Sequence, residues 1–194
     1  MKGFIIKSIA GDFHVLSYED NQVYVCKARG QIRNLNLQPV CGDEVTFEYD
    51  QQNNFSIIDK IHERKNQLVR PPISNVDVAL IVMSTIKPNF DSYLVDKLIV
   101  AASMQNIEPI IVVSKCELIT EEISSLIANY RLAGYTVIEV SSHQRINIDE
   151  VSKIIDIKNE WEKDYKILAL YIEHDELEKI GNVISKLNSN VENK

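Results

Sequence analysis

Apolar and polar residues alternate along the first seventy residues of the chain. Alternation with a period of two is the pattern of a β-strand that buries one face. Turn residues such as Gly11-Asp12 separate the alternating runs, and no helical period of 3.6 residues occurs among them. The pattern predicts five short strands, over residues 3–10, 13–18, 21–28, 42–50 and 54–63. Such a set of strands favours a small closed barrel, of either the OB-fold or the SH3-like kind.

The pattern changes at two adjacent prolines, Pro71 and Pro72. Prolines do not fit the interior of a helix or a central strand, so we expect a domain boundary here. The predicted organisation is a barrel domain over residues 1–68, a linker over 69–76 and a second domain over 77–194.

The second domain alternates continuous apolar runs with segments of helical period. The runs predict buried strands over residues 76–85, 109–114, 135–140 and 166–172. The helical segments are 91–105, the stretch between an N-cap at Thr120 and a stop at Gly134, 147–155 and 174–188. Alternating strands and helices predict a parallel sheet with helices on its faces, which binds ligands at the carboxyl ends of its strands.

Composition and charge narrow the choice of partners and location. The chain has 194 residues and a net charge of −7, and residues 1–70 hold nine Lys or Arg and nine Asp or Glu. Contact with a polyanion is therefore to be sought in the first part. The three cysteines form no Cys-x-x-Cys pair, which argues against zinc and disulfides. No apolar run reaches the length of a membrane span, and the expected location is the cytoplasm.

A sharper signal stands at the end of the second predicted strand of the sheet, where the sequence reads Ser114-Lys115-Cys116-Glu117-Leu118. Proteins that bind guanine nucleotides have Asn-Lys-x-Asp at this place. The carboxylate there accepts two hydrogen bonds from guanine that adenine cannot donate, which gives strong discrimination. Taken alone, the motif also fits a charged loop that follows a strand.

Five further segments of the chain resemble segments of a known protein family, and the spacing between them also matches that family. They are residues 64–77 (RKNQLVRPPISNVD), 27–33 (KARGQIR), 39–43 (PVCGD), 82–84 (VMS) and 87–90 (KPNF). Over residues 3–155 the chain resembles the RsgA (YjeQ) family of circularly permuted GTPases that act on the small ribosomal subunit.

The resemblance implies that the barrel is an OB-fold that contacts ribosomal RNA, and that a partial, circularly permuted G domain of the P-loop NTPase kind follows. The implied partners are the small ribosomal subunit and 16S-type rRNA, with no membrane. The implied guanine-binding residues are Ser114, Lys115, Glu117, Ser141 and Ser142. The expected RNA-binding residues, which also suit a simple solvated face, are Lys27, Arg29, Arg33, Arg64, Lys65 and Arg70.

The sequence departs from the family in its nucleotide site. Ser114 replaces Asn, and its side chain is too short to form both of the hydrogen bonds that the Asn amide makes. Glu117 replaces Asp and is longer by one methylene. No two of the six glycines lie five apart, so there is no Walker A phosphate loop, and no Asp-x-x-Gly occurs. The strand over 166–172 is followed by the acidic run Glu173-His-Asp-Glu-Leu-Glu, which would repel a triphosphate.

These departures predict no catalytic residue, no zinc or other metal site, and Mg²⁺ only together with a nucleotide. We expect at most weak binding of GTP or GDP and no hydrolysis, because phosphoryl transfer depends on the missing parts. The favoured function is an RsgA-like assembly factor of the small subunit with a degenerate GTP-binding domain. The alternatives are a truncated form of an active ribosome-dependent GTPase, and a non-ribosomal module whose acidic second domain binds a basic protein.

Overall fold

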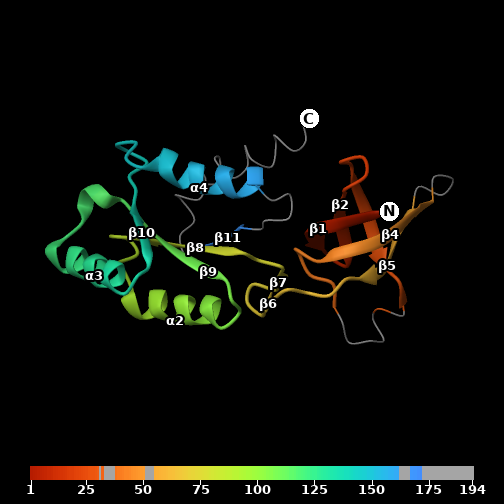
Figure 1. The fold of residues 1–194 in the computed structure, drawn as a ribbon, viewed down its shortest axis with the longest axis horizontal. Helices are drawn as coiled ribbons and strands as arrows, with labels where there is room; N and C mark the ends of the chain where they lie inside the picture. Colours follow the sequence, from red (N-terminus) through yellow and green to blue (C-terminus); the bar gives the residue numbers. More distant parts are fainter. Residues whose placement is uncertain (31, 33–37, 51–54, 162–166, 172–194) are drawn as a thin grey trace. The chain divides into compact units, whose positions relative to one another are not determined.

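The computed structural model describes residues 1–30, 32, 38–50, 55–161 and 167–171. The chain divides into two compact units, Met1–Val76 and Asp77–Lys194 (Figure 1). The second unit thus begins where the second domain was predicted to begin. Residues 69–76, predicted as a linker, belong to the first unit.

Five strands close the barrel of the first unit in the order β1-β2-β3-β5-β4. They are β1 (Lys2–Ile9), β2 (Asp12–Ser17), β3 (Val23–Ala28), β4 (Glu44–Asp50) and β5 (Phe55–Ile61). All the strand pairs are antiparallel except β3 with β5, which is parallel. This arrangement is that of an OB-fold, which confirms the barrel and decides against the SH3-like alternative.

Alternate residues of these strands fill the barrel. Ile5, Val15, Cys26, Val45, Phe47 and Ile58 are at most 1% exposed. Cys26 is a free thiol within this core, and burial raises its pKa to about 11. Cys41 and Cys116 are also free and are half-buried.

A short antiparallel hairpin follows the barrel. Its strands are β6 (Gln67–Leu68) and β7 (Ile73–Ser74), and the two prolines lie in the turn between them. Proline suits a turn because its fixed φ is compatible with turn geometry and it has no N–H to leave unpaired.

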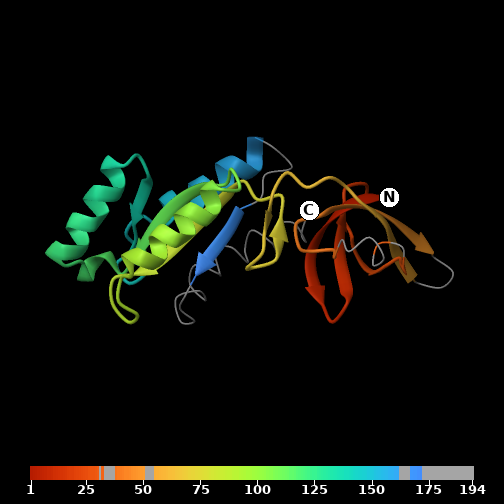
Figure 2. The same ribbon diagram turned by 90° about the horizontal axis from the view of Figure 1, so that it is seen from below.

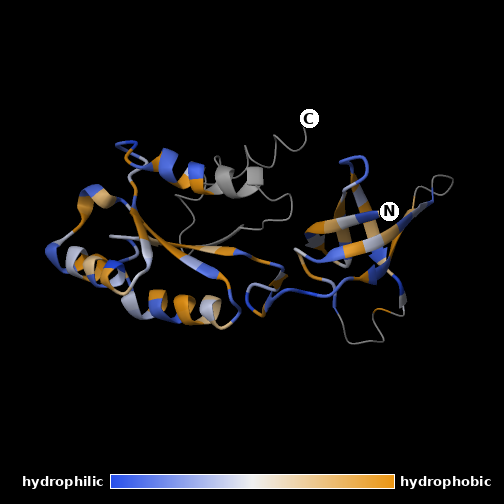
Figure 3. Cartoon of the chain, in the orientation of Figure 1, coloured by the Kyte–Doolittle hydropathy of each residue, from blue (hydrophilic) through white to orange (hydrophobic). Residues whose placement is uncertain are grey.

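The second unit is a parallel sheet in the order β10-β9-β8-β11. The strands are β8 (Val78–Ser84), β9 (Glu108–Ser114), β10 (Thr136–Glu139) and β11 (Ile167–Tyr171). Every residue of β8 is buried, as expected for a central strand covered on both faces. Figure 3 shows the apolar residues that run along β8 and β9.

In the described part of the second unit, helices lie on both faces of this sheet (Figures 1 and 2). Helices α2 (Ser92–Ser103) and α3 (Glu121–Leu132) pack on the face that carries Ile81 and Ile111. Helix α4 (Ile148–Trp161) packs on the opposite face through Val151. The predicted N-cap at Thr120 is confirmed, since its Oγ1 accepts from the N–H of Ile123 (3.4 Å).

The last two helices predicted for the second domain cover residues 147–155 and 174–188. Helix α4 runs to Trp161, six residues beyond the end at residue 155 that the sequence predicted. The predicted helix over 174–188 lies outside the described residues. No helix in the described part of the chain is long and apolar enough to span a membrane.

Candidate functional site

The loop after β9 is held on both sides by main-chain hydrogen bonds. Ser114, the last residue of β9, is fully buried, and its carbonyl accepts from the N–H of Thr85, which follows β8 (3.2 Å). The N–H of Cys116 donates to the carbonyl of Val140, which follows β10 (3.0 Å). The loop is therefore fixed at the carboxyl edge of the sheet, where parallel α/β proteins bind their ligands.

Lys115 connects this loop to the segment after β8. Its backbone is left-handed (φ 55°, ψ 44°), and it precedes the short 3-10 helix η1 (Cys116–Leu118). Its Nζ donates to the carbonyls of Ile86 (3.0 Å) and Lys87 (3.2 Å), and the hydroxyl of Thr85 donates to its carbonyl (3.0 Å). Thr85 and Ile86 were not among the predicted site residues, and their place just after a buried strand was the only signal for them.

Glu117 and Ser141 meet across the ends of β9 and β10. A hydrogen bond from Ser141 lowers the pKa of Glu117, so its carboxylate is charged at neutral pH. Within the described residues, neither Oε2 of Glu117 nor Oγ of Ser114 has a hydrogen-bond partner, although both atoms are buried. Buried polar atoms are normally paired, so unpaired ones point to a ligand or to water.

The segment after β10 is a tight loop that orients Ser141. The main-chain groups of Ser141 and Ile146 exchange two hydrogen bonds (3.1 and 2.9 Å), and the N–H of Gln144 donates to Oγ of Ser141 (3.0 Å). Ser142 follows at the surface, half-buried. The structure thus brings Ser114, Glu117 and Ser141 to one edge of the sheet, as the sequence predicted for neighbouring strands.

These residues were expected to bind a guanine base, and the groups they present can make only some of the hydrogen bonds that this requires. An ionised Glu117 with a buried unpaired oxygen can accept an N–H of guanine. Ser114 has one hydroxyl where the family has an amide, so it can replace only one of the amide's bonds. No group of three or more metal-ligating side chains occurs among residues 1–30, 32, 38–50, 55–161 and 167–171.

The expected RNA-binding residues of the barrel are partly paired with acids. Lys27 Nζ lies 2.6 Å from Asp12, and Arg29 Nη2 lies 2.8 Å from Asp59. The side chains of Lys27 and Arg29 remain about half exposed, and such surface pairs are weak enough to exchange for phosphate. Arg33 lies outside the described residues.

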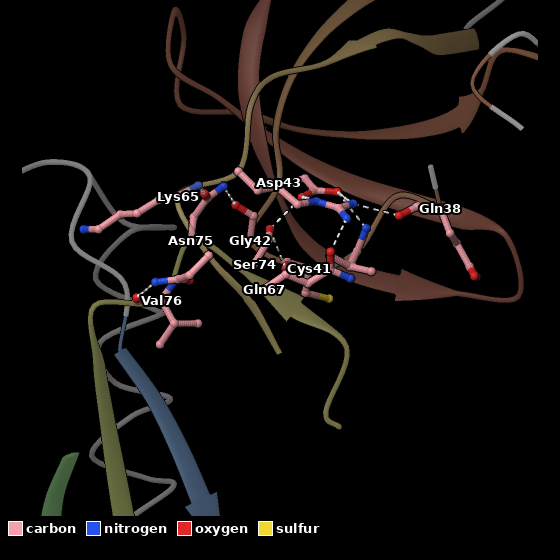
Figure 4. A network of polar contacts seen from close by, with 12 residues as sticks. Gln38, Cys41, Gly42, Asp43, Lys65, Gln67, Ser74, Asn75 and Val76 are labelled. Atoms are coloured by element: carbon pink, nitrogen blue, oxygen red, sulfur yellow. Dashed lines mark hydrogen bonds and ion pairs between the residues drawn. The ribbon is translucent and has the colours of Figure 1, made fainter. Parts of the chain in front are cut away.

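Arg64 is held inside the first unit instead of facing solvent. Its side chain is 13% exposed and forms two 2.7 Å bonds to the fully buried carboxylate of Asp43. It also donates to Gln67 (2.6 Å) and to the carbonyl of Gln38 (2.8 Å). Figure 4 shows this network around Asp43. These contacts give Arg64 a structural role, because RNA binding would have to break a buried ion pair. The sequence shows no sign that Asp43 lies beside it.

Lys65 and Arg70 are exposed, at the base and at the turn of the β6–β7 hairpin respectively. Of the cations expected to bind RNA, these two and the pair on the barrel, Lys27 and Arg29, therefore remain accessible.

Negative charge also gathers beside Arg29, whose Nη2 lies 3.4 Å from Glu48 Oε2. A cavity of about 580 Å³ is lined by Tyr24, Tyr49 and the carboxylates of Asp20, Glu48 and Asp50, together with Met1. The hydroxyl of Tyr24 donates to Asp20 (2.6 Å), and this bond raises the pKa of Tyr24 to about 12 and lowers that of Asp20. These charges disfavour phosphate contacts at the cavity itself.

Fold and site together define a class of protein. An OB-fold barrel precedes a parallel α/β unit, and this arrangement is that of YloQ, described as a circularly permuted GTPase. The sequence profile of the RsgA N-terminal domain matches residues 2–58, and that of the RsgA GTPase matches residues 61–161. The chain belongs to the RsgA GTPase family.

Curated relatives share both units of the chain. "Small ribosomal subunit biogenesis GTPase RsgA" of Halalkalibacterium halodurans is 40% identical over 159 residues, which cover 80% of this chain and 53% of that protein. The protein of the same name from Geobacillus kaustophilus is 39% identical over 155 residues, or 78% and 52%. The chain thus spans about half the length of these relatives.

Two crystal structures have the same fold. YloQ, described as a circularly permuted GTPase, superposes with a TM-score of 0.65 at 30% identity and covers 87% of this chain and 59% of its own. YjeQ from Thermotoga maritima superposes with a TM-score of 0.76 at 22% identity, over 94% and 64%, and this likeness concerns the fold alone.

Proposed function

We propose that this chain is an assembly factor of the small ribosomal subunit that binds rRNA through its first unit. The observation that carries the proposal is the match of both units to one family whose curated members are named for biogenesis of that subunit. Among the exposed cations of the first unit, Lys27, Arg29, Lys65 and Arg70 are the ones that we expect to contact phosphate. A role in ribosome assembly implies action in the cytoplasm.

Cosedimentation with purified small subunits tests this proposal. At low salt, where phosphate contacts are strongest, the chain should pellet with the subunits, and its apparent affinity should fall as salt increases. A chain that stays in the supernatant at low salt contradicts the proposal. Pelleting that does not depend on salt also contradicts it, because the contact would then not be with the phosphates.

We further propose that the second unit retains only the base-recognising end of a GTP site. Glu117 supplies a charged acceptor and Lys115 spans the loops after β8 and β9, but the printed sequence contains no phosphate loop. Most of the affinity and all of the catalysis of such sites depend on the phosphates and their Mg²⁺. Calorimetry with GDP and GTP should therefore show at most weak binding, and a submicromolar affinity would overturn this part.

One observation favours a second candidate, an active GTPase of which these residues are a part. The chain covers 53% and 52% of its curated relatives, whose names describe GTPases. The test is the genomic DNA downstream of codon 194. A phosphate-loop sequence there, in any frame, favours the second candidate, and its absence favours the first.

A further inference from the structure

One oxygen of the Glu117 carboxylate is already engaged within the fold. Ser141 donates a hydrogen bond to this carboxylate, and Oε2 has no partner among the described residues, so the bond from Ser141 engages Oε1. Guanine is recognised through two oxygens, one for the ring N–H and one for the exocyclic amino group. Glu117 therefore has one unpaired oxygen where this recognition requires two.

The hydrogen bond from Ser141 is held in place by the loop after β10. Ser141 is fully buried, and its Oγ accepts from the N–H of Gln144 (3.0 Å). A hydroxyl carries one proton, so with Gln144 bound to the oxygen that proton is directed to Glu117. Ser141 also exchanges two main-chain hydrogen bonds with Ile146, which keep its backbone in place. The carboxylate is thus held with one oxygen toward the end of β10.

Ser114 adds little discrimination between bases. It is fully buried, and its Oγ has no hydrogen-bond partner in the described part of the chain. Such an atom points to a ligand or to water. A hydroxyl donates as readily as it accepts, so it serves a keto oxygen and an amino group equally well. The choice of base is therefore left to Glu117.

A single charged acceptor distinguishes fewer bases than a pair does. Guanine and hypoxanthine both carry a ring N–H that can donate to Oε2 of Glu117. Adenine has a bare ring nitrogen at that place, and two acceptors that face each other repel. The exocyclic amino group, which guanine has and hypoxanthine lacks, finds no second oxygen. Glu117 is only half-buried, so this amino group can remain hydrated.

We propose that the site at the ends of β9 and β10 accepts 6-oxopurine nucleotides as a class. It binds hypoxanthine about as well as guanine and rejects adenine. Glu117 contacts the base, and Ser141 is the positioning residue that restricts Glu117 to one oxygen. The inference rests on the proposal that the second unit retains the base-recognising end of a GTP site, and it names the class of base that this end takes.

The test is an NMR titration of the ¹⁵N-labelled 194-residue chain with guanosine, inosine and adenosine monophosphate (GMP, IMP and AMP). Inosine carries hypoxanthine. Monophosphates suit the question because the printed sequence has no phosphate loop, so the contacts with the base decide the affinity. Amide shifts of Cys116 and Glu117 report binding even at millimolar affinity.

The variants are Ser141→Ala and Glu117→Gln. The matched control is Ser125→Ala, which removes an exposed hydroxyl that donates to the carbonyl of Glu121 within α3 (2.9 Å). Thermal melting checks that all three variants remain folded.

The unchanged chain should bind GMP and IMP with affinities within about threefold of each other, and AMP at least about tenfold more weakly. Ser141→Ala releases Oε1, so GMP should then bind about ten- to hundredfold more tightly than IMP, the value of one hydrogen bond to a charged group. Glu117→Gln should weaken GMP and IMP alike and abolish the discrimination against AMP, because an amide donates as well as accepts. Ser125→Ala should behave like the unchanged chain.

The outcomes separate the two levels of the argument. A chain that binds none of the three nucleotides overturns the retained base site and the inference with it. A chain that prefers GMP to IMP by tenfold or more overturns the inference alone, and so does one that binds AMP as well as IMP. If Ser141→Ala weakens GMP and IMP equally and leaves their ratio near one, Ser141 is merely structural and its positioning role is wrong.

Discussion

Replacing Arg64 with methionine keeps most of its aliphatic stem but removes the guanidinium that neutralises Asp43. Asp43 is fully buried, and its carboxylate accepts two bonds from Arg64, one from the hydroxyl of Ser74 and one from the N–H of Val40 (2.9 Å). The variant retains only the last two. Breaking a buried ion pair by removing one partner costs about 3–5 kcal/mol, because an uncompensated charge stays in the interior.

Hydrogen exchange measured on peptides of the barrel reports this loss. Amides of β1 and β4 that exchange only when the barrel opens should exchange about 10²- to 4 × 10³-fold faster in the variant, at about tenfold for each 1.4 kcal/mol. Peptides from β8 and β9 should not change, because they belong to the other unit. Trp161 is the only tryptophan and lies in the second unit, so its fluorescence provides an independent control in urea.

Arg131→Met is the matched control. Arg131 forms a similar ion pair, 2.8 Å from Glu139, but its side chain is 49% exposed, and such pairs contribute at most about 1 kcal/mol. The double variant Asp43→Asn with Arg64→Met should recover part of the loss, because the buried charge is then absent. If Arg64→Met costs no more than Arg131→Met, the Asp43 network does not stabilise the barrel and the reasoning is wrong.

Three further predictions concern single contacts. The double variant Ser114→Asn with Glu117→Asp should raise the affinity for GDP about ten- to hundredfold in calorimetry, the value of one charge-assisted hydrogen bond, and an unchanged affinity would show that these two residues do not limit binding. Ser141→Ala should raise the pKa of Glu117 toward its ordinary value in an NMR titration. Because that pKa is lowered in the folded chain, the stability it contributes is present above the ordinary carboxyl range and is lost as the pH falls through the lowered value, so the variant should depend less on pH in acid. Asp20→Asn should move the pKa of Tyr24 from about 12 toward 10 in an ultraviolet absorbance titration. The stability linked to Tyr24 is present below pH 10 and lost as the pH rises toward 12, and a titration that Asp20→Asn leaves unchanged would exclude this hydrogen bond as the cause.

The strands of the barrel could be predicted because each one carries its own alternation of apolar and polar residues. Their order could not, because the parallel pairing of β3 with β5 joins segments about thirty residues apart that share no local pattern. The choice between an OB-fold and an SH3-like barrel therefore depended on the resemblance to the RsgA family. The observed strand pairing confirms the OB-fold.

The candidate site also has features that the sequence could predict and features that it could not. The motif of Ser114, Lys115 and Glu117 follows a buried strand, so its place at the edge of the sheet could be predicted. Arg64 could not be told apart from Arg70, because both are basic residues in one segment of sequence. Their difference arises from Asp43, twenty-one residues before Arg64, which the fold buries beside it. Long-range burial of an acid has no signal in a single sequence.

The loop after β9 has a frame made of main-chain groups. Its bonds to Thr85 and Val140 involve the N–H and C=O of the backbone, so the side chains at positions 114 and 117 take no part in them. Substitutions that fit the buried space at position 114 therefore leave these bonds in place. The loop keeps its evolutionary freedom to lose or regain selectivity for a base, one side chain at a time.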